Sequence, residues 1–183
     1  VQTCALPISF KPYSRSSLTK GNEQLRFYDK ITGEVMTGWY HYRGKKYYLD
    51  PETGAAVTGV CTIDGEKYLF SSKGVLQTNT WKKTSAGTRY FGIYGRLVKS
   101  GWITLGGKTY YLDPDTGYRA TGVTWIDSKA YYFDSKGVMQ TKVWKTTHNG
   151  KRYFGKNGVM KTGKVTINGV KYVFDKKTGY LIK

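Results

Sequence analysis

The sequence predicts an all-β fold, a solenoid of stacked β-hairpins with about 21 residues to each hairpin. Large apolar residues recur at a constant step of 21 positions: Trp39, Val60, Trp81, Trp102, Val123, Trp144 and Val165. A fixed period of this length is typical of repeat architectures. Each of these positions is followed by a pair of large, mostly aromatic residues and then by a glycine. No window of 11 residues has the 3.6-residue period of a helix. Hairpins rather than helices are therefore expected throughout the repeat.

Each repeat has the local features of one hairpin. Residues 108–113 alternate in polarity as a strand does, and Pro114 and Gly117 then occupy favoured turn positions. The pairs Asp64-Gly65 and Asn168-Gly169 predict tight two-residue hairpin turns. A single hairpin is marginal in water, so neighbouring hairpins must bury their aromatic faces against one another.

A longer period contains the shorter one. Residues 37–99 and 100–162 are identical at 33 of 63 aligned positions, and Trp39 aligns with Trp102. The building block is therefore a trio of unlike hairpins. If one trio makes one turn of a superhelix, equivalent residues lie in rows along the array. Asp50 and Asp113, which begin equivalent turns, are expected to hydrogen-bond their local backbone.

Composition and charge limit the possible functions. The 183 residues include 16% aromatic residues and 23 glycines, so rings must supply much of the buried surface. The net charge is +18, from 30 Lys and Arg against 12 Asp and Glu. Residues 142–183 hold 11 of these basic residues and one acid, Asp175, which predicts contact with a polyanion. No apolar run approaches the roughly 18 residues of a membrane span.

The sequence predicts two segments. Residues 1–8 (VQTCALPI) resemble a translated sequencing adapter, which predicts a metagenomic fragment. Residues 9–24 are polar and aperiodic. We interpret residues 1–24 as an adapter-derived or disordered leader. Residues 25–183 form the repeat array.

Two segments of the array carry a family resemblance. The patterns TGW…GKKYYLD at 37–50 and GWITLGGKTYY at 101–111 resemble the cell-wall-binding repeat superfamily. It includes choline-binding repeats, glucan-binding repeats of glucosyltransferases and the C-terminal repeats of large clostridial toxins. The resemblance implies a left-handed superhelix of hairpins and a cell-surface or secreted location. It also implies an attached catalytic or toxic domain, and binding of surface polysaccharide, glucan or teichoic acid.

The resemblance further implies an aromatic cage for choline, because rings attract a quaternary ammonium by cation–π interaction. The matching residues are Trp39, Tyr47 or Tyr48, and Tyr68, followed by Trp102, Tyr110 or Tyr111, and Tyr131. Other units depart from this pattern. In three units the tryptophan is replaced, by Val60, Val123 and Lys164. In two other units the tryptophan is displaced by two residues, at Trp81 and Trp144. Few complete cages are therefore expected.

The valine units resemble glucan-binding repeats, in which sugars stack on rings in shallow troughs. Gln77 and Gln140 are candidates for holding sugar hydroxyls. The other candidates around the displaced tryptophans are Trp81, Lys82 and Tyr90, and Trp144, Lys145 and Tyr153. These features favour a polymeric glycan or teichoic acid over free choline.

Catalysis within the array is not expected. The two histidines, His41 and His148, occupy non-equivalent positions, and no nucleophile, metal or cofactor constellation accompanies them. Repetition instead favours many similar weak sites, which gain avidity on a polymer. We interpret the chain as a non-catalytic C-terminal anchor of a longer secreted protein. Two alternatives remain, a choline-binding module of a cell-wall hydrolase and a basic nucleic-acid-binding protein, although no nucleic-acid fold signature is present.

Overall fold

The computed structural model describes residues 24–182, so the predicted leader lies almost wholly outside the described residues. Fourteen strands of five residues follow one another, and the described residues contain no helix. The strands are β1 (Gly38–Tyr42), β2 (Lys45–Leu49), β3 (Gly59–Ile63), β4 (Glu66–Phe70), β5 (Thr80–Thr84), β6 (Gly87–Phe91), β7 (Gly101–Leu105), β8 (Lys108–Leu112), β9 (Gly122–Ile126), β10 (Lys129–Phe133), β11 (Val143–Thr147), β12 (Gly150–Phe154), β13 (Gly163–Ile167) and β14 (Val170–Phe174). The predicted all-β class is confirmed.

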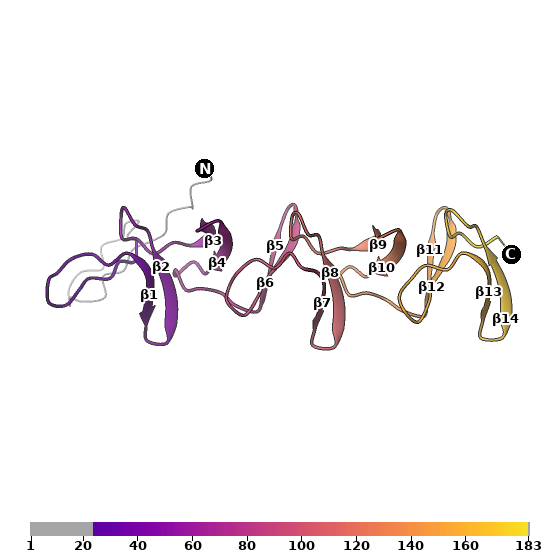
Figure 1. The fold of residues 1–183 in the computed structure, drawn as a ribbon, viewed down its shortest axis with the longest axis horizontal. Coiled ribbons are helices and arrows are strands. Elements are labelled where there is room, and N and C mark those ends of the chain that lie inside the picture. Colours follow the sequence, from indigo (N-terminus) through magenta and orange to yellow (C-terminus); the bar gives the residue numbers. More distant parts are fainter. Residues whose placement is uncertain (1–23, 183) are drawn as a thin grey trace. The chain divides into compact units, whose positions relative to one another are not determined.

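Each pair of consecutive strands forms its own two-stranded antiparallel sheet, giving seven hairpins (Figure 1). The predicted tight turns are present. Asp64 and Gly65 have φ of 49° and 78°, and Asn168 and Gly169 have φ of 50° and 83°. Two consecutive residues with positive φ match the twist of the flanking strands, which is why Asp-Gly and Asn-Gly occur there.

The described residues divide into two compact units, one up to Val98 with β1–β6 and one from Lys99 onward with β7–β14. Within each unit, the segment that follows one hairpin bonds to the preceding hairpin. The Leu76 amide after β4 donates to the Lys46 carbonyl on β2, at 2.8 Å. The Met139 amide after β10 donates in the same way to the Thr109 carbonyl on β8, at 2.8 Å. These bonds stack the hairpins in sequence order, as predicted.

The core lies at the last residue of each second strand. All seven of these side chains are 0–2% exposed: Leu49, Phe70, Phe91, Leu112, Phe133, Phe154 and Phe174. Some glycines of the turns that follow the second strands approach a neighbouring segment closely. At Gly158, which has a φ of 77°, a Cβ atom would lie 2.7 Å from Met139 Sδ. Only glycine combines this conformation with this close approach.

Aspartates close several of the longer turns. The Asp113 Oδ1 atom accepts hydrogen bonds from the Thr116 amide at 2.7 Å and from the Thr116 hydroxyl at 2.6 Å. Asp50 and Thr53 form the same pair of bonds, so the expected local backbone bonding is confirmed. The Thr116 hydroxyl and then its amide lower the pKa of Asp113, because both stabilise the carboxylate.

This lowered pKa predicts a measurable acid sensitivity. The stability that the Asp113 carboxylate contributes is fully present above its ordinary pKa of about 3.9 and is lost as pH falls through the lower folded value. We therefore expect Asp113→Asn to destabilise the protein more at pH 7 than at about pH 2.5, measured by urea unfolding. Asp115→Asn, in the same turn, leaves both Thr116 bonds in place and is the matched control. An equal effect of Asp113→Asn at both pH values would contradict this account.

Candidate functional site

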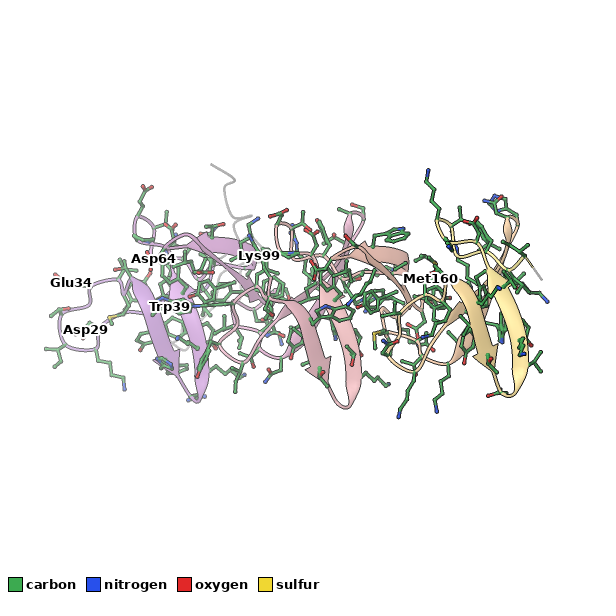
Figure 2. All side chains as sticks on the ribbon, turned by 45° about the vertical axis from the view of Figure 1, so that its right-hand side comes forward. Asp29, Glu34, Trp39, Asp64, Lys99 and Met160 are labelled. Carbon is green, nitrogen blue, oxygen red and sulfur yellow. The ribbon has the colours of Figure 1, made fainter. Side chains whose placement is uncertain are left out.

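A cluster of four aromatic rings spans the first two hairpins. Trp39, on β1, lies 5.2 Å from the Tyr48 ring on its partner strand. It also contacts two rings of the next hairpin, Tyr68 at 5.0 Å and Phe70 at 6.1 Å between ring centroids. Figure 2 labels Trp39 on the β1–β2 hairpin. We call these residues the Trp39 cluster.

The second unit contains two equivalent clusters. In the Trp102 cluster, the indole lies 5.1 Å from Tyr111, 4.8 Å from Tyr131 and 5.9 Å from Phe133. The Trp144 cluster consists of Trp144, Tyr153, Tyr172 and Phe174, and its ring distances from the indole are 5.0, 5.1 and 5.7 Å. The tryptophan meets the next hairpin's tyrosine edge-on in each cluster, with interplanar angles of 64–71°.

Strand register explains why the same four positions meet in every cluster. The second residue of the first strand pairs with the fourth residue of the second strand, as in Trp39↔Tyr48 and Trp102↔Tyr111. Cross-strand neighbours on one face of a hairpin are in side-chain contact. Edge-to-face packing is favourable for aromatic pairs, and it leaves part of the indole open. Trp102 keeps 38% of its surface exposed, whereas Trp39 and Trp144 are half-buried.

Register also selects one ring from each predicted tyrosine pair. Tyr48 and Tyr111 join the clusters, and both are half-buried. Tyr47 is 6% exposed and packs against Phe27 at 5.1 Å, on the other side of the strand. Tyr110 is also buried, at 9%. Tyr47 and Tyr110 are thus part of the core, although the pattern alone left both rings of each pair as candidates.

The predicted two-residue displacement of Trp81 and Trp144 is wrong. Both residues occupy the second position of their strands, where Trp81 pairs with Tyr90 and Trp144 with Tyr153. The Trp81 and Tyr90 rings are 4.9 Å apart. In the last hairpin, Lys164 rather than Val165 holds this position, since it pairs with Val173. Tyr172, which contacts Trp144, was not among the predicted site residues, although it opens the last large-residue pair of the repeat, Tyr172-Val173.

The polar side chains that were predicted to bind the ligand differ in their exposure and contacts. Lys82 is exposed on β5. The Lys145 ammonium lies 4.8 Å over the Tyr132 ring of the preceding hairpin. The side-chain amides of Gln77 and Gln140 are used within their own turns, donating to the carbonyls of Val75 and Val138 at 3.0 and 3.1 Å. These amide donors therefore stabilise turns, and the role of both glutamines in holding sugar hydroxyls stays a prediction.

Charged groups lie near the Trp39 and Trp102 clusters. Burial, and then the nearby Asp64 carboxylate, raise the pKa of Tyr48, and burial followed by Asp127 does the same to the pKa of Tyr111. The Lys46 ammonium lies 4.3 Å over the Trp39 ring.

Within residues 24–182, no group of three His, Cys, Asp or Glu side chains is placed to hold a metal, and no helix could cross a membrane.

The chain is similar to known proteins of streptococci and clostridia. The family model for a cell wall binding repeat, of the choline-binding type, matches residues 37–52, 100–115 and 124–139. Glucosyltransferase-I of Streptococcus downei is 30% identical over 174 residues, covering 76% of this chain and 11% of the enzyme. Toxin A of Clostridium novyi is 32% identical over 111 residues, covering 56% of this chain and 5% of the toxin.

Solved structures agree with these matches. CbpJ from Streptococcus pneumoniae TIGR4 has a TM-score of 0.72 and 28% identity, covering 85% of this chain and 55% of CbpJ. Choline binding protein F from Streptococcus pneumoniae, solved in the presence of a peptidoglycan analogue, has a TM-score of 0.67 and 32% identity. That match covers 80% of this chain and 52% of the other. The chain thus spans about half the length of these solved chains and about a tenth of the glucosyltransferase.

Proposed function

Because the chain is built from repeats of the cell-wall-binding superfamily, to which choline-binding and glucan-binding repeats belong, we propose that it is a non-catalytic module that binds a bacterial surface polymer. The polymer is a teichoic acid or an anionic polysaccharide. The observation that carries this proposal is the threefold recurrence of one ring cluster, around Trp39, Trp102 and Trp144.

The clusters suit a repeating ligand. Each one presents a partly open indole framed by tyrosines, and such a surface can stack on a sugar face or attract a cation. One cluster of this kind is a weak site. Several on one chain act together on a polymer, because each bound site raises the effective concentration of the next.

Surface charge supports an anionic polymer. The net charge of +18 attracts phosphate or carboxylate groups over a distance that salt limits to about 8 Å at physiological ionic strength. In the second unit, the exposed basic side chains include Lys151, Lys156 and Lys164. Arg152 is different. Its Nε donates to the Thr178 carbonyl at 2.9 Å, and its guanidinium stacks 4.0 Å from the Tyr180 ring, so it has a structural role.

The role of the whole protein is part of the proposal. The match to about a tenth of a glucosyltransferase supports an anchoring module within a longer secreted protein.

A second candidate function is recognition of choline carried on the polymer. It is favoured by the exposed Trp102 indole, which Tyr111 and Tyr131 flank edge-on with interplanar angles of 69° and 71°.

Binding to purified cell walls should depend on salt. We expect the protein to be retained at low salt and released severalfold at about 0.5 M salt, because exposed charges are screened while ring stacking persists. Replacing Lys151, Lys156 and Lys164 together by glutamine should remove much of this salt dependence, and so should stripping teichoic acid from the walls. Retention is measured by sedimentation with the walls.

Competitors separate the alternatives in this assay. Salt-insensitive retention that free dextran competes away would contradict the polyanion proposal and favour a neutral glucan. Equal binding to single-stranded DNA and to walls, lost together as salt rises, would show that charge alone is responsible.

A further inference from the structure

The turn that follows β6 has an apolar tip. Ile93 and Tyr94 are consecutive residues of this turn, and 66% and 77% of their surfaces are exposed. Single exposed apolar residues are common on protein surfaces and need no explanation. Two large ones at adjacent positions of one turn are different, because together they form an apolar patch that faces water. We call Ile93 and Tyr94 the apolar tip.

The backbone of the turn does not require apolar side chains. The Gly95 amide donates to the Gly92 carbonyl at 2.9 Å, and the Gly158 amide donates to the Gly155 carbonyl at 2.9 Å in the equivalent turn after β12. Equivalent turns have exposed polar residues at the two tip positions: Ser72 and Lys73 after β4, Ser135 and Lys136 after β10, and Lys156 and Asn157 after β12. Turn formation therefore does not explain the apolar tip.

The segment that carries the apolar tip is basic. Residues 67–98, which run from β4 to the end of the first unit, contain six Lys and Arg and no Asp or Glu. The exposed ones are Lys73, Lys82, Lys83 and Arg96. Although its Nε donates to the Tyr68 hydroxyl at 2.9 Å, Arg96 keeps its charge, because arginine stays protonated in proteins. A positive field without carboxylates attracts an anionic surface.

Ile31 offers a comparison within the same unit. It also lies in a turn and is 95% exposed, but Asp29 and Glu34 flank it. The Asp29 Oδ1 atom accepts a hydrogen bond from the Ile31 amide at 2.8 Å. A negative charge this close opposes the approach to an anionic surface. Exposed apolar side chains and positive charge therefore coincide at the apolar tip and not at Ile31.

We propose that the apolar tip inserts into the headgroup region of an anionic lipid bilayer, and that the basic residues of 67–98 hold the chain against it. Each part has a physical reason. The Ile93 side chain leaves water for an apolar environment, and the amphipathic Tyr94 ring suits the membrane–water interface. Lys and Arg are attracted to anionic headgroups over one Debye length, about 8 Å at physiological ionic strength.

A lipid surface fits the small size of the apolar tip better than a protein partner does. A specific protein interface buries about 800 Å² on each partner, which is more than two turn side chains supply. A bilayer sets no such minimum, because shallow apolar insertion and attraction to anionic headgroups add to each other. This inference goes beyond the proposed function, since it adds a lipid surface to the polymer and does not use the ring clusters.

Polar replacement of the apolar tip tests the inference. The full chain is sedimented with vesicles of equimolar phosphatidylcholine and phosphatidylglycerol, and in parallel with vesicles of phosphatidylcholine alone. We expect the Ile93→Ser/Tyr94→Asn variant to bind the mixed vesicles about tenfold more weakly than the parent, because the apolar insertion is lost. The parent should bind phosphatidylcholine vesicles at least about tenfold more weakly than mixed vesicles, because the headgroup attraction is lost.

The double variant isolates the apolar contribution. Serine and asparagine leave the net charge unchanged, and both already occupy tip positions in equivalent turns, at Ser72 and Asn157. Circular dichroism verifies that the β-structure is kept. Ile31→Ser is the matched control, since it removes an exposed apolar turn residue outside the basic segment. It should change vesicle binding by less than about twofold, as expected for a side chain that does not enter the bilayer.

Three results with vesicles would overturn the inference. These are unchanged binding in Ile93→Ser/Tyr94→Asn, an equal loss in Ile31→Ser, and equal binding of the parent to the two kinds of vesicle. The first would show that charge alone holds the chain on lipid. Sedimentation velocity without vesicles tests another occupant. A dimer that the Ile93→Ser/Tyr94→Asn variant abolishes would assign the apolar tip to a second copy of the chain.

Retention on lipid-free cell walls separates this inference from the proposed function. The Ile93→Ser/Tyr94→Asn variant should be retained as strongly as the parent, because the apolar tip is not part of the polymer site. Equal losses on walls and on vesicles would place the apolar tip in the polymer site and overturn the inference. Absence of vesicle binding by the parent, with wall retention intact, would defeat the inference and leave the proposed function standing.

Discussion

Replacing Phe133 by alanine should lower the free energy of unfolding of the second unit by about 3–5 kcal/mol, which is the usual cost of emptying a buried aromatic site. Phe133 ends β10, is 0% exposed and supports the Trp102 indole at 5.9 Å. The other buried side chains of this two-stranded hairpin are Ile126 and Ala130, so few neighbouring groups can move in to fill the cavity. Urea unfolding followed by far-ultraviolet circular dichroism measures the change.

Trp125→Ala is the matched control for this variant. Trp125 is also a large aromatic residue of the β9–β10 hairpin, but 59% of its surface is exposed. Its removal should change the free energy of unfolding by no more than about 0.5 kcal/mol, as is usual for surface positions. Equal effects of Phe133→Ala and Trp125→Ala would contradict the assignment of the core to the ends of the second strands.

Removing the tryptophans of all three clusters should weaken retention on cell walls by at least about a hundredfold, because linked weak sites multiply one another's effect. The triple variant replaces Trp39, Trp102 and Trp144 by alanine, and each single variant should lose much less. Half-saturation of purified walls by the protein measures the change. These indoles are partly exposed, so their loss should cost less stability than the loss of Phe133.

The control for the triple variant is again Trp125→Ala, which removes an exposed tryptophan outside the clusters. It should leave retention unchanged. If the folded triple variant binds walls no more weakly than its single variants do, the clusters do not act together. The polymer would then be held by charge or by another surface of the array.

The sequence determined the repeat and its local structure. Turn pairs such as Asp64-Gly65, and the alternation of strand residues, are local signals, because positive φ and the period of two are properties of a few adjacent residues. The 63-residue super-repeat also placed Trp39 and Trp102 in equivalent positions. For these reasons the hairpins, and the equivalence of Trp39 and Trp102, were predictable.

Only the tertiary structure decided which side chains meet. Tyr48 rather than Tyr47 joins Trp39 because the register pairs it across the hairpin, and a one-residue change of register would have exchanged the two faces. Tyr68 completes the cluster from the next hairpin, and Lys46 places its charge over the indole. These contacts join residues that a local pattern cannot relate, since they depend on cross-strand register and on how successive hairpins stack. The physical reason is that alternation assigns a side chain to a face, whereas packing between hairpins determines its neighbours.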